Sequence, residues 1–351
     1  MRAYKFHSQC LEIIFSAQSF IEILQVEHMK CCYLIQTHKN PEQIFRLVRL
    51  IKYSSPNSQV IISHDAHVKK LPFEPIQDLQ DVHLLQDTKP RFRGDFSLIK
   101  PYLDTVSWLR EHNSTFDWLI YLSGQDYPVT PIPKIEDFLG NTEYDGFIDF
   151  WKAFSEESVW DQGKFWKRYY CQYQRFPKVT VPLLKAVSDL SRYRKKISVS
   201  KLRGLIPDVQ PFLTYGPLIG TPSKTTPFNN EYHCFGGFQW HTLSRKCVDY
   251  IYEYILKHPA LLSYYKRTVV PDESLIQTIL VNSNKFNLCN DNKRYADTYE
   301  REYGHARTLT VADYEMLVAS EYHFARKFDI DVDSRILEKL DSFLRKNHRE
   351  I

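Results

Sequence analysis

An apolar run that stops abruptly in polar residues most constrains the fold of this chain. Residues 118–122 are all apolar or aromatic without alternation, which is typical of a strand covered on both faces in a parallel sheet. Ser123, Gln125 and Asp126 follow at once, in a segment that Pro128 ends. Ligands of open α/β sheets bind outside the carboxyl ends of the strands, so these three side chains are expected to face a ligand. The alternative is a plain turn in which Asp126 caps its own backbone.

Short apolar strands and amphipathic helices alternate on both sides of this run. We expect strands at 31–37, 59–63, 82–85, 146–150 and 233–240, and helices at 44–51, 94–112, 135–139, 243–256 and from 271 onward. This alternation predicts an α/β fold with a doubly wound, mostly parallel sheet, right-handed crossovers and helices on both faces. Gly236 and Gly237 are paired in one expected strand, where they allow a ligand or a neighbouring backbone to approach closely.

Between residues 151 and 228 the alternation fails, and we interpret this stretch as an insertion. Aromatic residues from Trp160 onward, Tyr169 among them, are interleaved with lysines and arginines as far as Arg175, and a basic helix is expected at 183–197. A basic aromatic strip can bind single-stranded nucleic acid, because bases stack on the rings and phosphates pair with the cations. It can equally line a groove for an acidic or glycan acceptor, or form a solvated helix with one aromatic face.

The composition narrows the class of protein. The 46 basic and 42 acidic side chains give a formal net charge of +4, which is too small to indicate nucleic-acid binding by itself. The seven cysteines have no C-x-x-C spacing, which argues for a reducing compartment and against a disulfide scaffold or a zinc site. Aromatic residues make up 15% of the chain, a content that suits a sugar ligand as well as a packed core.

No segment reaches the roughly 18 uninterrupted apolar residues that a membrane helix needs. Residues 11–26 come closest, but glutamates interrupt them, so they predict an amphipathic helix without the features of a signal peptide. We interpret residues 1–29 as an N-terminal extension that is either native or a consequence of the choice of start codon. One domain is expected over residues 30–333, followed by a C-terminal helix over 334–351.

One carboxylate and two cations are candidates for chemistry. Glu273 follows Pro271 in the expected first turn of a helix, where the macrodipole favours an ionised side chain that can accept a proton from a hydroxyl nucleophile. Arg307 and Lys327 flank an expected helix and could together neutralise a diphosphate. The plainer alternatives are a carboxylate that only decorates a helix start and two solvated cations. The sequence contains neither a dinucleotide-binding glycine motif nor a phosphate-binding loop.

Six short motifs occur in an order that is found in one known family. They are Tyr33-Leu34-Ile35-x-x-His38-Lys39, Gly94-Asp95-Phe96-Ser97-Leu98, Leu122-Ser123-Gly124-Gln125-Asp126-Tyr127-Pro128, Gly236-Gly237-x-x-Trp240, Pro271-Asp272-Glu273 and Phe324-Ala325-Arg326-Lys327-Phe328. From about Cys31 to Asp333 the chain therefore resembles the core-2/I-branching enzyme and peptide O-xylosyltransferase family. It is similar to the bacterial members, which lack the stem and membrane anchor of the animal proteins.

This resemblance implies an inverting glycosyltransferase with a GT-A-like fold that uses a UDP-sugar and needs no divalent metal or other cofactor. The implied donor is UDP-GlcNAc or UDP-xylose, and the implied acceptor is a hydroxyl of a glycan or a protein. The glutamate of the Pro-Asp-Glu motif is the general base in the branching enzymes, which implies that role for Glu273. Asp126 lies in a motif shared with the xylosyltransferases, so it would face the acceptor or the transferred sugar and compete for the same role.

The resemblance also implies contacts to the nucleotide. Arg307 and Lys327 would bind the diphosphate, although the spacing between them is slightly shorter than in the animal branching enzymes. His38 and Asp65 would lie near the base and the ribose. We expect the sugar or the acceptor to contact Ser123, Gln125, Tyr169, Gly237 and Trp240.

Two rival functions stay open from the sequence. The strip at 160–175 could make the chain a nucleic-acid-binding protein, whereas the enzyme interpretation includes no nucleic-acid partner. The chain could also be a catalytically inactive relative that binds glycans. For the enzyme we expect a role in polysaccharide biosynthesis and a cytoplasmic location, either free or in peripheral contact with a membrane.

Overall fold

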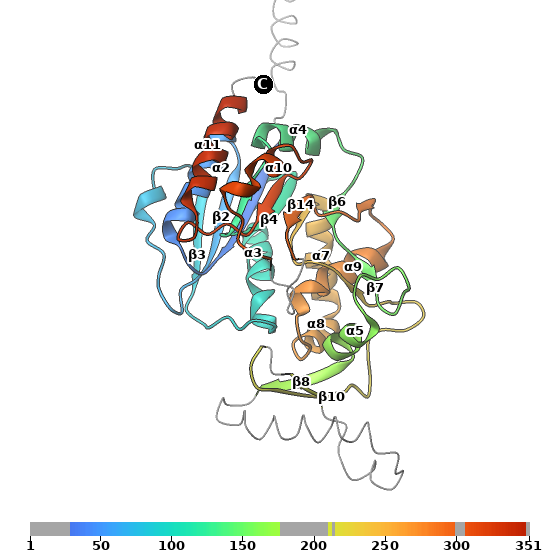
Figure 1. The fold of residues 1–351 in the computed structure, drawn as a ribbon. Helices are drawn as coiled ribbons and strands as arrows, with labels where there is room; N and C mark the ends of the chain where they lie inside the picture. Colours follow the sequence, from blue (N-terminus) through green and yellow to red (C-terminus); the bar gives the residue numbers. More distant parts are fainter. Residues whose placement is uncertain (1–28, 176–209, 213–214, 299–305, 349–351) are drawn as a thin grey trace, which may run out of the picture.

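The computed structural model describes residues 29–175, 210–212, 215–298 and 306–348, which are drawn in colour in Figure 1. The basic helix predicted at 183–197 and residues 1–28 of the predicted N-terminal extension lie outside this part of the chain. Within it, a central sheet is covered by helices on both faces, and a smaller sheet lies at one end (Figure 1).

The central sheet runs in the order β13-β6-β12-β4-β1-β2-β3. Its strands are β1 (Cys31–Thr37), β2 (Gln59–Asp65), β3 (Val82–Asp87), β4 (Trp118–Ser123), β6 (Gly146–Ile148), β12 (His241–Ser244) and β13 (Leu288–Cys289). β12 is antiparallel to its neighbours β4 and β6, and the other adjacent pairs of this sheet are parallel. The apolar run at 118–122 is therefore a central strand, and the predicted mostly parallel sheet is confirmed.

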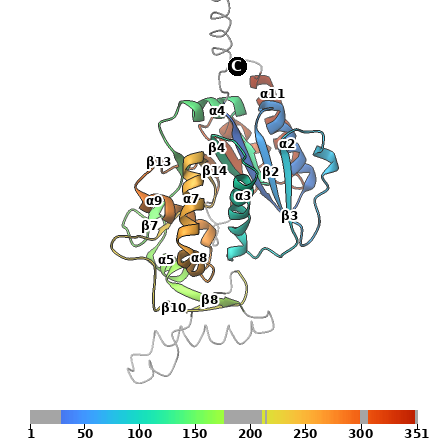
Figure 2. The ribbon, with the colours of Figure 1, turned by 180° about the vertical axis from the view of Figure 1, so that it is seen from behind.

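Helices cover both faces of the sheet, which explains why its strands are apolar without alternation. The helices are α2 (Pro41–Ser54), α4 (Ile132–Asn141) and α11 (Ser334–His348) on one face, and α3 (Lys100–Glu111), α7 (Arg245–Lys257) and α9 (Leu275–Ser283) on the other. Tyr33 and Ile35 of β1 pack into the first core, whereas Leu34 packs into the second. Figure 1 shows α2 and α11 in front of the sheet, and Figure 2 shows α3 and α7 in front of it from behind.

A second small sheet brings a late segment of the chain to the end of β4. It consists of β5 (Asp126–Pro128), β14 (Arg294–Ala296) and β15 (Phe324–Arg326). β15 pairs in antiparallel fashion with β5, so that Arg326 lies opposite Asp126, and it pairs in parallel with β14. This pairing carries Lys327 to the carboxyl edge of the central sheet.

The predicted insertion contains its own antiparallel sheet and a helix. Its elements are β7 (Trp151–Lys152), α5 (Gln162–Tyr169), β8 (Cys171–Arg175), β9 (Gln210–Phe212) and β10 (Leu218–Pro222). β10 lies between β8 and β9. In Figure 1 this sheet is at the bottom of the molecule, near α5 and α8 (Pro259–Tyr265).

The strand predicted at 233–240 is wrong for most of its length. Only β11 (Phe235–Gly236) is extended, in an antiparallel pair with β7, and the strand in the central sheet is β12, immediately afterwards. At Gly237 the backbone lies against the carbonyl of Asp149, where a Cβ would collide. Gly237 therefore lets two backbone segments approach each other closely.

Two predicted helix starts are 3₁₀ turns instead of α-helical turns. η2 (Phe96–Leu98) precedes α3, and the side chain of Asp95 caps it by accepting a hydrogen bond from the N–H of Ser97. η4 (Pro271–Glu273) precedes α9, and Ser274, with a φ of −152°, interrupts the helical backbone between them. The remaining short elements are η1 (Glu74–Ile76), η5 (Val311–Asp313) and α10 (Tyr314–Val318).

Candidate active site

A cavity of about 660 Å³ lies at the carboxyl ends of β1, β2 and β4. This is the edge at which ligands bind in open α/β sheets. The predicted site residues that line it are His38, Asp65, Ser123, Gln125, Trp240, Glu273 and Lys327. Glu273 and Lys327 thus share one cavity, although they come from different elements.

Asp126 does not line the cavity, and its surroundings are those of a structural carboxylate. Its side chain is completely buried. It accepts hydrogen bonds from the N–H of Ser123 at 3.0 Å and from the Ser123 hydroxyl at 2.7 Å, and it forms an ion pair with Arg326 at 3.3 Å. Asp126 therefore stabilises the loop after β4, whereas Ser123 lines the cavity.

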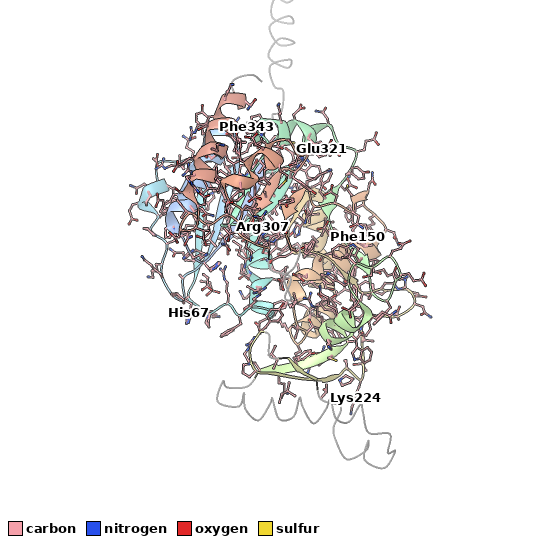
Figure 3. All side chains as sticks on the ribbon, in the orientation of Figure 1. His67, Phe150, Lys224, Arg307, Glu321 and Phe343 are labelled. Atoms are coloured by element: carbon pink, nitrogen blue, oxygen red, sulfur yellow. The ribbon has the colours of Figure 1, made fainter. Side chains whose placement is uncertain are left out.

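Arg307 also lies outside the cavity lining, although its neighbour Ala306 belongs to it. Two carboxylates bind its guanidinium: Nε donates to Asp297 at 2.5 Å, and Nη1 and Nη2 donate to Asp313 at 2.9 and 2.5 Å. The hydrogen bonds to Asp313 raise the pKa of Arg307 above its already high ordinary value. Figure 3 shows Arg307 near the middle of the molecule. The diphosphate contact expected for this side chain stays a prediction.

Tyr169 and Gly237 were expected to contact a sugar, but both contact the turn that carries Glu273. The hydroxyl of Tyr169 donates to the carbonyl of Val270 at 3.0 Å, and its ring is completely buried. The N–H of Gly237 donates to the carbonyl of Glu273 at 2.9 Å. In this structure the two residues hold the backbone of η4 in place.

Glu273 is the carboxylate that the cavity offers to a ligand. It ends η4, and its side chain is 26% exposed. Oε2 accepts a hydrogen bond from Nη1 of Arg168 at 2.6 Å. Oε1 accepts none from any residue that the structure describes. One oxygen of this carboxylate is thus held, and the other is available to a hydroxyl group.

Asp272, next to Glu273, also lines the cavity but is buried. Burial, followed by the negative charge of Glu273, raises the pKa of Asp272. The Oδ1 atom of Asp272 has no hydrogen-bond partner among the described residues. Burial therefore keeps a proton on Asp272 to a higher pH than on a solvated carboxyl group.

Lys327 is half-buried in the cavity wall, immediately after β15. Burial, followed by the nearby charges of Arg326 and Arg93, lowers its pKa to about 8. Among the described residues no carboxylate forms an ion pair with it. A cation that is partly desolvated and lies beside other cations is well placed to bind an anion.

The sequence analysis missed several cations and amides of the cavity wall. Arg91 and Arg93 follow β3, and the rule that placed Ser123 at the end of its strand could have identified them as well. Arg326 lies with its guanidinium 4.4 Å from the centre of the Trp240 ring. The sequence places Arg326 next to Lys327 in one of the six motifs, but it does not show which side chains Arg326 contacts.

A network of amide and hydroxyl groups fixes one wall of the cavity. Tyr121 donates from its hydroxyl to Gln36, and the amide of Gln239 donates to the Tyr121 hydroxyl at 2.8 Å. Nearby, burial, followed by the charge of Lys39, lowers the pKa of His38. Fixed polar groups of this kind orient a ligand in an otherwise apolar pocket.

Several residues in the described part of the basic aromatic strip pack inward. Trp160 is 6% exposed, and the Nζ of Lys164 and the guanidinium of Arg168 lie 3.9 and 4.8 Å from the centre of its ring. Phe165 is completely buried. Burial, followed by the charge of Arg168, lowers the pKa of Lys164 to about 8. These contacts connect the strip to the cavity wall, whereas Trp166 and Lys167 of the same strip are exposed.

Comparison with known proteins identifies the family. The family model for the Core-2/I-branching enzymes matches residues 31–319. The chain belongs to this family. Membership confirms the resemblance shown by the six motifs.

Similarity to individual proteins is weaker. Over 277 residues the chain is 23% identical to "Xylosyltransferase oxt" of Drosophila melanogaster, and the match covers 72% of this chain but 26% of that protein. The solved structure of S. aureus TarS 1-349 in complex with UDP-GlcNAc matches 44% of this chain and 42% of its own, at 11% identity and a TM-score of 0.26. A TM-score this low carries no argument about the ligand.

Two features are absent from the residues that the structure describes. No helix in this part of the chain is long and apolar enough to cross a membrane. In the same residues, no group of three or more His, Cys, Asp or Glu side chains is placed to hold a metal ion.

Proposed function

We propose that the enzyme transfers GlcNAc or xylose from UDP to a hydroxyl group of a glycan or protein acceptor, with inversion at the anomeric carbon. The supporting observation is that Glu273 and Lys327 line the same cavity. Among the described residues, one carboxylate oxygen of Glu273 accepts no hydrogen bond and Lys327 has no ion-pair partner. The volume of about 660 Å³ is within the range of about 300–1,000 Å³ that ligand sites occupy.

In this proposal Glu273 acts as the general base. The acceptor oxygen attacks the anomeric carbon while its O–H bond breaks and the proton passes to Oε1 of Glu273. On the opposite face of the sugar, the bond from the anomeric carbon to the phosphate oxygen breaks, and its electron pair leaves with UDP. A single displacement of this kind inverts the configuration. General-base catalysis by a positioned side chain typically contributes about 10²–10⁴-fold.

The departing UDP is stabilised by cations of the cavity wall. Lys327, Arg326 and Arg93 all line it, and preorganised positive charge stabilises the negative charge that develops on a leaving group. We propose that these side chains allow transfer without a divalent metal. Enzyme treated with EDTA is then expected to keep its turnover. A loss of turnover that manganese restores would show that the proposal is wrong.

The donor is proposed from the family and from its relative, so both GlcNAc and xylose are included. A panel of UDP-sugars compared by thermal melting separates the two, because a ligand that binds only the native state raises the melting temperature by mass action. The correct donor is expected to give the largest shift. A protein stabilised by glycans but by no UDP-sugar would instead be the inactive glycan-binding relative.

The decisive experiment replaces the base. E273Q keeps the size of the side chain and one acceptor oxygen for Arg168 but cannot accept the proton, so transfer is expected to fall about 10²–10⁴-fold while UDP affinity stays normal. E231Q is a matched control, because Glu231 is exposed and lies outside the cavity lining. Near-normal transfer by E273Q would exclude Glu273 as the base.

A further inference from the structure

The insertion brings a buried arginine to the proposed base. Nη1 of Arg168, near the C-terminal end of α5, donates to Oε2 of Glu273 at 2.6 Å, and the two side chains are 11% and 26% exposed. A hydrogen bond between a guanidinium and a carboxylate is charge-assisted and stronger than a neutral one. The pair therefore joins the insertion to a carboxylate that lines the cavity.

Arg168 is itself held in position by an aromatic ring. Its guanidinium lies 4.8 Å from the centre of the Trp160 ring, on which Lys164 also lies. Trp160 packs against Gly236 so closely that a Cβ on this glycine would collide with the ring. The first glycine of the Gly236-Gly237 pair thus admits the ring that supports Arg168.

The backbones of α5 and of the turn that carries Glu273 are joined by hydrogen bonds. The N–H of Val269 donates to the carbonyl of Arg168 at 3.1 Å, and the hydroxyl of Tyr169 donates to the carbonyl of Val270 at 3.0 Å. Together with the bond from Gly237 to Glu273, these contacts fix the turn from both sides. The orientation of the carboxylate consequently depends on the insertion.

We propose that Arg168 is a positioning residue for Glu273: it holds Oε2 so that Oε1 is directed at the acceptor hydroxyl. This inference rests on the proposed function of Glu273 as the base. Arg168 is not among the described residues that line the cavity, and its ion pair is with Glu273. It would therefore act on the reaction through Glu273 and not through the donor. An ion pair adds little net stability on average, whether it is exposed or buried, which makes a role in orientation the better account of this one.

The experiment separates kcat from the KM of the donor. R168Q is expected to lower kcat about 10–100-fold, because misplacing a catalytic group by about 1 Å can cost 10²-fold, and to change the KM of the UDP-sugar by less than about twofold. R168K retains a cation but not the fork of the guanidinium, so it is expected to recover part of the lost kcat. Added guanidinium at a concentration below that which unfolds the protein is expected to raise the kcat of R168A.

K167Q is the matched control. Lys167 lies next to Arg168 on α5, is exposed and has no ion pair with Glu273 in the described residues, so this variant is expected to keep the kcat of the original protein. The melting temperature of each variant shows whether it is folded. Where R168Q is unfolded, R168K provides the test, since it keeps the buried charge.

The outcomes separate this inference from the proposed function. A kcat of R168Q equal to that of the original protein would overturn it, and so would a raised donor KM with no recovery by R168K or guanidinium. If E273Q loses transfer and R168Q does not, only the role of Arg168 is wrong. If E273Q keeps transfer, the proposed function itself fails.

Discussion

Two carboxylates near the cavity, Glu273 and its competitor Asp126, were candidates for the base, and each is paired with an arginine in the structure. Asp126, paired with Arg326, is completely buried, and both of its oxygens are occupied. Glu273, paired with Arg168, is 26% exposed, and the described residues bond to only one of its oxygens. A base needs a lone pair that a hydroxyl can reach, so the comparison favours Glu273 for chemistry and Asp126 for support.

The two predicted diphosphate ligands differ in the same way. The guanidinium of Arg307 is bound by Asp297 and Asp313, whereas Lys327 has no carboxylate partner among the described residues. A cation whose charge is already neutralised by two carboxylates offers little to a further anion. In both comparisons the two residues differ in whether their charged group is already bonded by other side chains, and not in the kind of charge that they carry.

The largest effect is expected at Asp126. D126N leaves Arg326 as a buried charge without its partner, and such a change typically costs about 3–5 kcal/mol in the free energy of unfolding. Urea denaturation measures this loss. S123A removes one hydrogen bond to Asp126 and is expected to cost only about 1 kcal/mol. If D126N were as stable as the original protein but inactive, the role of base would pass to Asp126.

The next largest effect is expected at Lys327, and Arg307 serves as its comparison. K327M removes the available charge, and we expect kcat/KM and UDP affinity to fall about 100-fold, an effect in the range found for removing one group that stabilises a transition-state charge. R307M is expected to change either value by less than about fivefold. Titration calorimetry with UDP measures the affinity. Equal losses in both variants would mean that Arg307 also reaches the diphosphate.

The smallest effect is a dependence on pH. The pKa of Lys327 is lowered to about 8, so its side chain is a cation below that pH and becomes neutral above it. We expect kcat/KM to fall about tenfold per pH unit above pH 8, because this ratio reports the free enzyme. K327R stays charged and is expected to lack this limb. If kcat/KM of K327R still falls above pH 8, the fall is caused by the titration of another group.

Much of the fold and the location of the site follow from local patterns. The strand at 118–122 was predicted because its residues are apolar on both faces, and Ser123 and Gln125 line the cavity because the polypeptide turns polar where that strand ends. His38 and Asp65 are in the cavity for the same reason, at the ends of β1 and β2. A rule about strand ends needs no knowledge of distant residues.

The partners of the site residues could not be predicted in this way. Arg168 belongs to a strip with three open interpretations, and only the packing of α5 against the turn at 271–273 shows that it reaches Glu273. The strand predicted at 233–240 failed because Gly237 approaches the Asp149 carbonyl, a contact between segments far apart in the chain.

The sequence by itself determined the alternation of strands and helices, the polar strand ends and a short set of charged candidates, because these depend on neighbouring residues and on the period of each element. The tertiary structure decided which candidates are available. Whether a carboxylate or a cation can act on a ligand depends on which of its atoms are already bonded and how far it is removed from water. The residues that determine this for Asp126, Glu273, Arg307 and Lys327 include segments brought together only when the sheet and the insertion are folded.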